Sequence, residues 1–262
     1  MLSPRPAGAD GGLAVDLNCD MGEGMDTDAA IFPFISSANI ACGAHAGDAD
    51  TMRRTVEMAL RHGVSIGAHP SYPDKANFGR IDILGKPLRP EDLPVLLYEQ
   101  LHRLQSICRE FGVRLRHVKP HGALYNRAAA DRAVAALVTR AILNFDPSLL
   151  LYGLSGSELR KQAMRDGLGF VSEVFADRGY RADGSLVPRS EPGALIESPD
   201  VAEAQVLKMV GEGLVETAAG NVAILAETVC LHGDGAHAVE FAELIHGALT
   251  RLGARVAAPV SN

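Results

Sequence analysis

Short apolar runs alternate with amphipathic segments along most of the chain. The runs have the length of strands, and we expect strands at residues 13–17, 37–41, 64–68, 113–119, 149–152, 169–174 and 221–226. Between them apolar residues recur at helical spacing, which predicts helices at residues 51–62, 89–111, 131–144, 157–166, 198–216 and 236–251. Strands that alternate with helices form right-handed β–α–β units around a parallel sheet. The pattern therefore predicts an α/β fold of seven or eight such units.

The two ends of one helix can be located in the sequence, and the length of the chain predicts a single domain. An acidic cap before residues 51–62 (Asp48 or Asp50) and the glycine after them mark the two ends of one helix. The 262 residues suit one (β/α) barrel. No GxGxxG motif follows an early strand, as a dinucleotide-binding fold would require. We therefore expect a single barrel domain at residues 13–262, preceded by a flexible Pro/Gly/Ala-rich lead-in at residues 1–12.

The net charge, the lengths of the apolar runs and the cysteine spacing limit the partners and the cellular compartment that we expect. A formal net charge of −7 argues against nucleic acid and against an anionic membrane surface as partners. No apolar run reaches the length of a membrane span, and residues 1–12 lack the apolar core of a signal peptide. The four cysteines, Cys19, Cys42, Cys108 and Cys230, form no CxxC pair, so we expect reduced thiols and not a zinc knuckle. These features predict a cytoplasmic protein.

Clusters of polar and ionisable residues follow six of the predicted strands. They occupy residues 16–23, 39–48, 67–74, 117–126, 173–180 and 230–235. In a parallel barrel the C-terminal ends of all strands meet on one face, where the loops supply the active site. Solvated loops would favour Lys, Ser and Glu, whereas these clusters hold the His, Gly, Pro and Asn of constrained, functional loops. The sequence therefore predicts an active site at these strand ends.

The nine histidines divide into two groups by position. Four of them, His45, His69, His121 and His232, lie at predicted strand ends, where we favour a functional role. The others lie on helices or within a strand, where packing or solvation explains them: His62, His102, His117, His237 and His246.

At several candidate positions a structural role explains the residue as well as a catalytic role does. Asp48 can be a helix cap, and Asn18 and Asp20 can be turn residues. The strand-end histidines and Asp16 are side chains that suit zinc or manganese. However, HExxH is absent and the ligands are far apart in the sequence, so we expect no tightly bound metal.

Two glycine-containing segments invite comparison with phosphate-binding loops. Residues 79–87 have five residues between the glycines and a proline where Ser or Thr should bind Mg²⁺, so we reject a P-loop there. Residues 153–157 follow a predicted strand and open a helix, where free N–H groups and the helix dipole can bind a phosphate or carboxylate. Ser157 as an ordinary helix cap explains the same residues, and both interpretations stay open.

The chain resembles the LamB/YcsF family in five motifs. They read DLNCDMGE at 16–23, NIACGAHAGD at 39–48, GAHPSYPD at 67–74, VKPHGALYN at 118–126 and EVFADR at 173–178. The resemblance runs from about residue 14 to about residue 253. It departs at Ile81, where a second Arg is expected, and at residues 217–221. The resemblance implies an irregular barrel of about seven strands, similar to the glycoside hydrolase and deacetylase barrels.

The resemblance also implies an activity and partners. The activity is the ATP-dependent hydrolysis of 5-oxo-L-proline to L-glutamate, with ATP and Mg²⁺ as co-substrate. The chain would be the first of the three components, A, B and C, of a 5-oxoprolinase, so subunits B and C would be its partners. A lactam is a poor electrophile, and phosphorylation of its oxygen would create a good leaving group. Two alternatives remain open: a metal-dependent, deacetylase-like hydrolase of an amide or carbohydrate that acts alone, and a non-catalytic lactam-binding protein of the complex.

Candidate roles follow from this implied chemistry. Six residues are candidates for catalysis: Asp16, Asp20 and Glu23 as base or Mg²⁺-nucleotide ligands, and His45, His69 and His121 as acid/base or orienting groups. Six further residues are candidates for binding the substrate: Asn18, Lys119, Glu173, Arg178, His232 and Asp234. Arg178 has the planar fork that suits a carboxylate.

Overall fold

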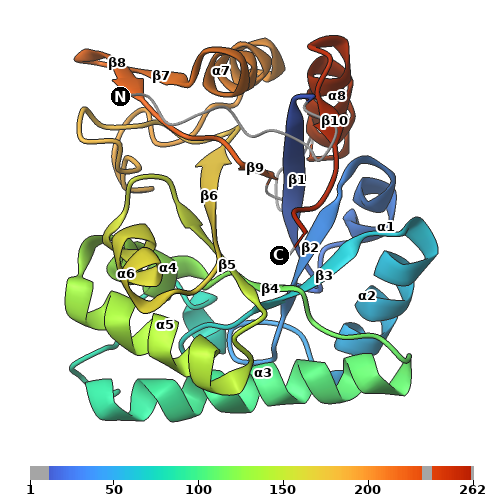
Figure 1. Ribbon diagram of the computed structural model, residues 1–262, viewed down its shortest axis with the longest axis vertical. Helices are drawn as coiled ribbons and strands as arrows, with labels where there is room; N and C mark the ends of the chain where they lie inside the picture. Colours follow the sequence, from blue (N-terminus) through green and yellow to red (C-terminus); the bar gives the residue numbers. More distant parts are fainter. Residues whose placement is uncertain (1–11, 232–237, 261–262) are drawn as a thin grey trace.

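Seven parallel strands close into a barrel. The structure is a computed structural model that describes residues 12–231 and 238–260. The barrel strands are β1 (Ala14–Met21), β2 (Ser37–Ala41), β3 (Ser65–His69), β4 (His117–Val118), β5 (Leu150–Leu154), β6 (Phe170–Phe175) and β9 (Thr228–Leu231). They pair in this order, and β9 also pairs with β1, which closes the ring (Figure 1). The predicted irregular α/β barrel of about seven strands is confirmed.

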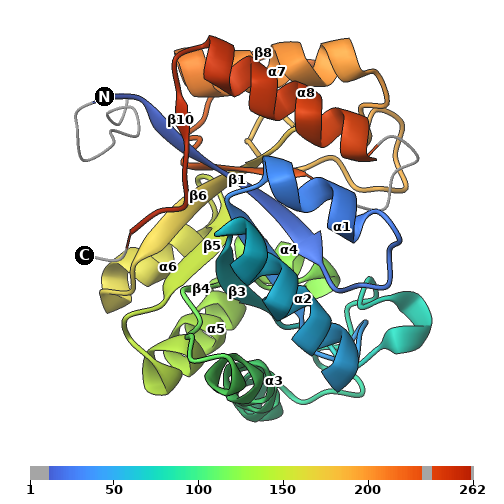
Figure 2. The same ribbon diagram turned by 90° about the vertical axis from the view of Figure 1, so that its right-hand side faces the viewer.

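Helices surround the barrel on its outer side (Figure 2). They are α1 (Asp28–Ile31), α2 (Ala49–His62), α3 (Leu93–Glu110), α4 (Gly122–Ala130), α5 (Arg132–Phe145), α6 (Glu158–Asp166), α7 (Pro199–Glu212) and α8 (Ala238–Arg251), with short 3-10 turns at Phe32–Phe34, Lys75–Asn77 and Pro90–Asp92. Apolar side chains between helices and strands form the core, and Leu97, Leu101 and Leu104 of α3 are buried in it. In the part of the chain that the structure describes, no helix is long and apolar enough to span a membrane.

The predicted helices are present with small shifts at their ends. Helix α2 begins at Asp48, whose Oδ1 accepts a hydrogen bond from Thr51 N at 2.8 Å, and ends at Gly63 with φ of 67°. Helix α4 was not expected, because its residues belong to the polar motif at 118–126. That motif leaves the barrel at His121 and turns directly into the helix.

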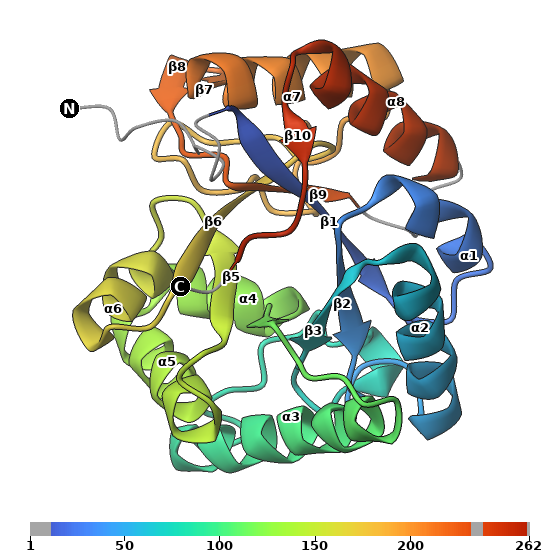
Figure 3. The same ribbon diagram turned by 45° about the vertical axis from the view of Figure 1, so that its right-hand side comes forward.

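The predicted position of the seventh strand is wrong. The sequence predicts it at residues 221–226, but β8 (Gly220–Ala223) pairs in an antiparallel hairpin with β7 (Leu214–Thr217). The hairpin lies outside the barrel beside α7 (Figure 3). Burial explains the difference, because β8 is largely exposed whereas all of β9 is buried and fills the gap between β6 and β1. The short strand β10 (Arg255–Val256) pairs with the start of β1.

Strand β1 is longer than predicted, and its polar residues face the barrel interior. It extends over Ala14–Met21, so Asn18 and Asp20, like Asp16, lie within the strand and not in the loop after it. Residues two apart in a strand share a face. Accordingly, these side chains hydrogen-bond to residues of other barrel strands, whereas Leu17 and Cys19 belong to the apolar core. The barrel therefore has a polar interior along β1.

Asp16 occupies the deepest part of this polar interior. Its carboxylate accepts hydrogen bonds from the hydroxyl groups of Ser36 (2.6 Å), Ser37 (2.8 Å) and Thr228 (2.7 Å). Burial raises the pKa of Asp16, although the hydroxyl groups act in the opposite direction. Because Thr228 lies on β9, the carboxylate ties together the strands at which the barrel closes.

We expect Asp16→Ala to lower the free energy of unfolding by about 3 kcal/mol, because three hydroxyl groups, those of Ser37 and Thr228 buried and that of Ser36 partly buried, lose their acceptor. Urea denaturation followed by circular dichroism measures this change. The control is Asp50→Ala, whose side chain is 80% exposed and whose removal should change stability by about 0.5 kcal/mol or less. Equal effects of the two substitutions would contradict a stabilising role for Asp16.

Candidate active site

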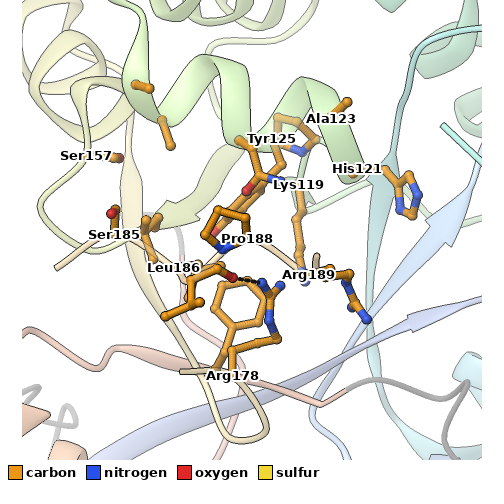
Figure 4. A pocket seen from close by; sticks show the side chains of 18 of the residues that line it. Lys119, His121, Ala123, Tyr125, Ser157, Arg178, Ser185, Leu186, Pro188 and Arg189 are labelled. Carbon is orange, nitrogen blue, oxygen red and sulfur yellow. Dashed lines mark hydrogen bonds between the residues drawn. The ribbon is translucent and has the colours of Figure 1, made fainter. Parts of the chain in front are cut away.

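A pocket of about 780 Å³ opens at the C-terminal ends of the barrel strands. Side chains at or just after the ends of β1, β3, β4, β5 and β6 line it, together with residues 183–190 of the loop after β6 (Figure 4). A pocket therefore lies on the face where the sequence places the active site.

The Lys119 ammonium group is the centre of a buried network at the inner end of the pocket. Its Nζ lies 2.9 Å from Asp20 Oδ1 and 2.8 Å from Glu173 Oε1. It also donates to Asn18 Oδ1 at 3.2 Å, and Asn18 Nδ2 donates to Glu173 Oε1 at 3.0 Å. Lys119, Asn18 and Glu173 are buried. A cation at this depth is stable because two carboxylates neutralise it.

The charge of Lys119 is fixed by its neighbours. Burial acts to lower the pKa of Lys119, but Asp20 and Glu173 outweigh burial and hold this pKa well above its usual value. The Cys230 thiol lies 3.0 Å from Nζ, and burial raises the pKa of Cys230. Cys230 is therefore a neutral thiol and a poor nucleophile, whereas Lys119 is a permanent hydrogen-bond donor at the pocket.

Four side chains meet beside Asp20, and we call them the His/Glu cluster: Glu23, His45, His69 and His121. Their ligand atoms lie within 4.8 Å of one another. Glu23 Oε1 is 2.8 Å from His45 Nε2 and 3.4 Å from His121 Nδ1. The rings of His45 and His121 stack with centroids 3.8 Å apart. Residues from three separate loops and one strand end thus converge on one small volume.

Backbone carbonyls determine which ring nitrogens of the cluster carry protons. His69 Nδ1 lies 2.7 Å from Lys119 O, and His121 Nε2 lies 2.9 Å from Phe78 O. A carbonyl oxygen only accepts, so both of these nitrogens donate. In the neutral rings the other nitrogens, His69 Nε2 and His121 Nδ1, then present lone pairs to each other at 2.9 Å. Two facing acceptors require a cation, which is either a proton held by one ring or a metal ion.

The His/Glu cluster could hold a divalent metal ion. Burial lowers the pKa of both His45 and His121 to about 3, which leaves these rings neutral, the state in which histidine ligates metals. The hydrogen bonds from His69 and His121 to carbonyls are the outer contacts that orient metal-binding histidines. Buried His45 Nδ1 has no hydrogen-bond partner among the described residues. Three imidazoles and one carboxylate suit zinc or manganese.

The opposite side of the pocket carries Arg178 and the start of helix α6. Arg178 donates through Nε to Ala194 O at 3.0 Å and through Nη2 to Val187 O at 2.7 Å. The Nε–H and Nη2–H groups, which we expected to bind a carboxylate, therefore donate to backbone carbonyls instead. At α6, Ser157 Oγ accepts a hydrogen bond from Arg160 N at 3.2 Å, so the helix-cap interpretation of Ser157 is confirmed. Residues 154–158 nonetheless line the pocket.

The predicted site residues separate into three groups by position. Six line the pocket: Asp20, Glu23, His69, Lys119, His121 and Arg178. Three lie directly behind these and contact them: Asn18, His45 and Glu173. Asp16 is four residues, or about 13 Å of strand, before Asp20 and lies outside the pocket. His232 and Asp234 lie outside the described residues.

Sequence reasoning missed several residues around the site. His117, expected as a packing residue, does stack on Tyr152, but its Nε2 also lies 2.8 Å from Asn39 Oδ1. Asn39 Nδ2 then donates to Asn18 Oδ1 at 2.7 Å and to Asp20 Oδ1 at 2.9 Å, so His117 orients Asn39 toward the Lys119 network. Gly67 makes this possible, because a Cβ there would collide with the His117 ring.

Two further residues missed by the sequence line the pocket, Tyr125 and Arg189. Tyr125 is part of the motif at 118–126, which could have indicated it. Arg189 lies in a loop without any motif, and only the fold brings it to the pocket.

Comparison with known proteins identifies the family. The model of the LamB/YcsF family matches residues 15–262. The crystal structure of a lactam utilization protein from Thermus thermophilus is similar, with 40% identity and a TM-score of 0.87. The match covers 94% of this chain and 100% of that chain.

More distant structures share the fold alone. One is a putative cellobiose-phosphate cleavage protein from Enterococcus faecalis, with 13% identity, a TM-score of 0.57, and coverage of 93% of this chain and 96% of that chain. Another is the catalytic domain of a peptidoglycan N-acetylglucosamine deacetylase from Eubacterium rectale, with 14% identity, a TM-score of 0.53, and coverage of 99% and 94%. The family model and the similarity to the lactam utilization protein confirm the resemblance seen in the motifs over nearly the whole chain, and the protein belongs to the LamB/YcsF family.

Proposed function

We propose that this protein hydrolyses the cyclic amide of 5-oxo-L-proline to give L-glutamate, with ATP as co-substrate and with subunits B and C of a 5-oxoprolinase as partners. The observation that carries the proposal is the charged Lys119 network, which faces the same pocket as Glu23, His69 and His121 of the His/Glu cluster. The similarity to a lactam utilization protein supports the choice of a lactam as substrate.

The network supplies a donor for the lactam oxygen. Lys119 divides three N–H donors among four neighbours, and its contacts to Asn18 and Cys230 do not involve a carboxylate. The entering lactam oxygen takes the place of one of these two weaker partners. The ammonium then stabilises negative charge that develops on this oxygen when the ring carbon is attacked.

Carboxylates at the pocket supply a proton acceptor. Asp20 and Glu23 both line the pocket, and either can take a proton from the attacking water. The bond from ring carbon to ring nitrogen breaks, the nitrogen gains a proton, and the carbon becomes the side-chain carboxyl carbon of glutamate. ATP transfers its terminal phosphoryl group to the lactam oxygen and leaves as ADP, which makes the ring carbon a better electrophile than that of an unactivated lactam. Ring opening by the first water then gives an acyl phosphate, and a second water releases phosphate and leaves the side-chain carboxylate of glutamate.

A second candidate function is amide hydrolysis that depends on a divalent metal and not on ATP. The observation that favours it is the pair of facing lone pairs of His69 and His121 within the His/Glu cluster. Glu23, His45, His69 and His121 would hold the ion. Such an ion would polarise an amide carbonyl as a Lewis acid.

The two functions predict different cofactor requirements for lactam hydrolysis. We expect release of glutamate and phosphate from 5-oxo-L-proline and ATP when this chain is combined with subunits B and C, and none from this chain alone. Glutamate and phosphate are measured in parallel, with and without ATP. Absence of glutamate in every combination would refute the proposed function, whereas ATP-independent hydrolysis by the chain alone would establish the second candidate.

We expect Lys119→Met to lower glutamate release in the assembled enzyme at least about 100-fold, because the lactam oxygen loses its charged donor. The double variant Lys119→Met/Glu173→Gln removes one carboxylate together with the cation, so the fold can persist where the single variant fails. Lys208→Met is the control, since Lys208 lies on α7 and pairs with Glu216 away from the pocket. Near-normal rates in a folded Lys119 variant would contradict this role.

We expect the isolated chain to bind about one equivalent of zinc or manganese at the His/Glu cluster. Isothermal titration calorimetry and metal analysis after dialysis measure the binding directly, without reference to activity. His69→Ala and His121→Ala should abolish it, whereas His102→Ala on the exposed side of α3 should not. Unchanged metal content in the two cluster variants would refute a metal at this place and would assign the shared cation to a proton.

A further inference from the structure

The loop after β6 covers the opposite side of the pocket from the His/Glu cluster, and we call residues 177–196 the arginine loop. Its two arms are held together by backbone hydrogen bonds, with Gly179 N to Ala194 O at 3.1 Å and Val187 N to Gly179 O at 2.9 Å. Ile196 N also donates to Asp177 O at 2.9 Å. The loop is therefore a defined structure whose middle part, residues 183–190, lines the pocket.

Arg178 holds this loop from the inside. Its side chain is 6% exposed, and two of its N–H groups donate to Ala194 O and Val187 O in the two arms of the loop. Arg178 Nη1 makes no hydrogen bond to any residue in 12–231 or 238–260, and Arg178 lines the pocket. Arg178 thus holds the two arms of the loop together, and its Nη1 is available to bind a ligand in the pocket.

Arg189 is carried by the same loop to the same cavity. Figure 4 shows the Arg178, Arg189 and Lys119 side chains at the pocket. Burial lowers the pKa of Arg178, and the next largest cause is the nearby charge of Arg189, which outweighs that of Asp177. Two guanidinium groups therefore lie close enough to repel each other.

Within the described ranges neither arginine forms an ion pair with a carboxylate, although the charge of nearby Asp177 acts to raise the pKa of Arg178. By contrast, Arg181 of the same loop pairs with Glu191 through contacts of 2.7 and 2.8 Å, and Lys161 pairs with Glu158 at 2.7 Å. A solvated surface arginine needs no partner, but Arg178 is buried, and a buried cation requires a counter-charge. An anion that binds in the pocket can supply that counter-charge.

Charged residues of both signs line the pocket. Arg178 and Arg189 lie at the arginine loop (Figure 4), and Asp20 and Glu23 lie at or just after the end of β1, where Asp20 pairs with Lys119. An anionic group that enters the pocket is repelled by Asp20 and Glu23 and attracted by Arg178 and Arg189. Arginine binds the planar oxygens of a carboxylate or the oxygens of a phosphoryl group through several N–H donors at once.

We propose that Arg178 and Arg189 form an oxyanion-binding subsite that selects substrates carrying an anionic group, in which both arginines contact the anion and Arg178 also positions the loop. If the proposed lactam hydrolysis is correct, the anion is the carboxylate of 5-oxo-L-proline, and the subsite turns the lactam oxygen toward Lys119. A phosphoryl group has the same chemistry and is the other possible source of the oxyanion.

The test compares ligands with and without a carboxylate on the same ring. Isothermal titration calorimetry of the full chain at constant ionic strength gives Kd values for 5-oxo-L-proline, 2-pyrrolidinone and inorganic phosphate. Arg189→Ala should weaken binding of 5-oxo-L-proline about 10- to 100-fold and leave 2-pyrrolidinone unchanged. Arg181→Ala, a matched control in the same loop but paired with Glu191, should change neither.

Arg178→Lys tests the positioning role, because lysine keeps the charge but cannot donate to both carbonyls. It should reduce the preference for 5-oxo-L-proline and also speed amide hydrogen exchange at Gly179 and Val187, whereas Arg189→Ala should leave this exchange unchanged. Unaltered exchange in Arg178→Lys would refute that role.

The remaining outcomes separate this subsite from the proposed function. Loss of phosphate binding in Arg189→Ala, with the ratio between the two lactams unchanged, would assign the subsite to a phosphoryl group. Equal weakening of both lactams, or no change for any ligand, would overturn the subsite, as would a wild-type chain that binds none of the three. Arginine-dependent anion binding without lactam hydrolysis in the assembled enzyme would leave the subsite standing and refute the proposed function.

Discussion

The ion pairs of Lys119 with Asp20 and Glu173 are the constraint on which the site depends. Moving an ammonium group into a barrel interior is very unfavourable unless carboxylates surround it, and Lys119 has two within 2.9 Å. The requirement is mutual, because Glu173 is fully buried and would itself be unstable without the cation. Asn18, Asn39 and His117 extend the network by further hydrogen bonds, and buried Glu173 Oε2 and His117 Nδ1 have no hydrogen-bond partner among the described residues. The result is a polar interior in which few side chains can change alone.

Strand β1 gives this network its geometry. Its alternating residues place Asp16, Asn18 and Asp20 one above another on the inner face, so a stabilising layer lies below and a reactive layer lies at the pocket. Lys119 also links the network to the His/Glu cluster, because its backbone carbonyl accepts from His69 Nδ1 while its side chain holds Asp20. The backbone of the residue that carries the buried charge thereby determines that Nδ1 is the donor nitrogen of His69.

The sequence predicted the barrel, most helices and the face that carries the site, because these follow from periodicity and from the geometry of parallel strands. It ended the first strand at residue 17 and so placed Asn18 and Asp20 in a loop, although the alternation Asp-Leu-Asn-Cys-Asp is itself typical of a half-polar strand. It placed the seventh strand at 221–226, because apolar character does not distinguish a barrel strand from an outer hairpin. All four residues of the His/Glu cluster were candidates, but their close contact and the position of Arg189 could not be predicted, since tertiary folding alone brings residues far apart in the sequence to within a few ångströms.

The closure of the barrel between β1 and β9 has a consequence for how the protein folds. The hydrogen bond from Thr228 to Asp16 joins residues 212 positions apart, and the β1–β9 ladder has the same separation. Contacts of such long range form slowly, because a long loop of chain must first be ordered. Until β9 arrives, β1 and β6 have open edges and the interior charges face water. The closure of the barrel and the polar interior beneath the pocket therefore depend on the same strand.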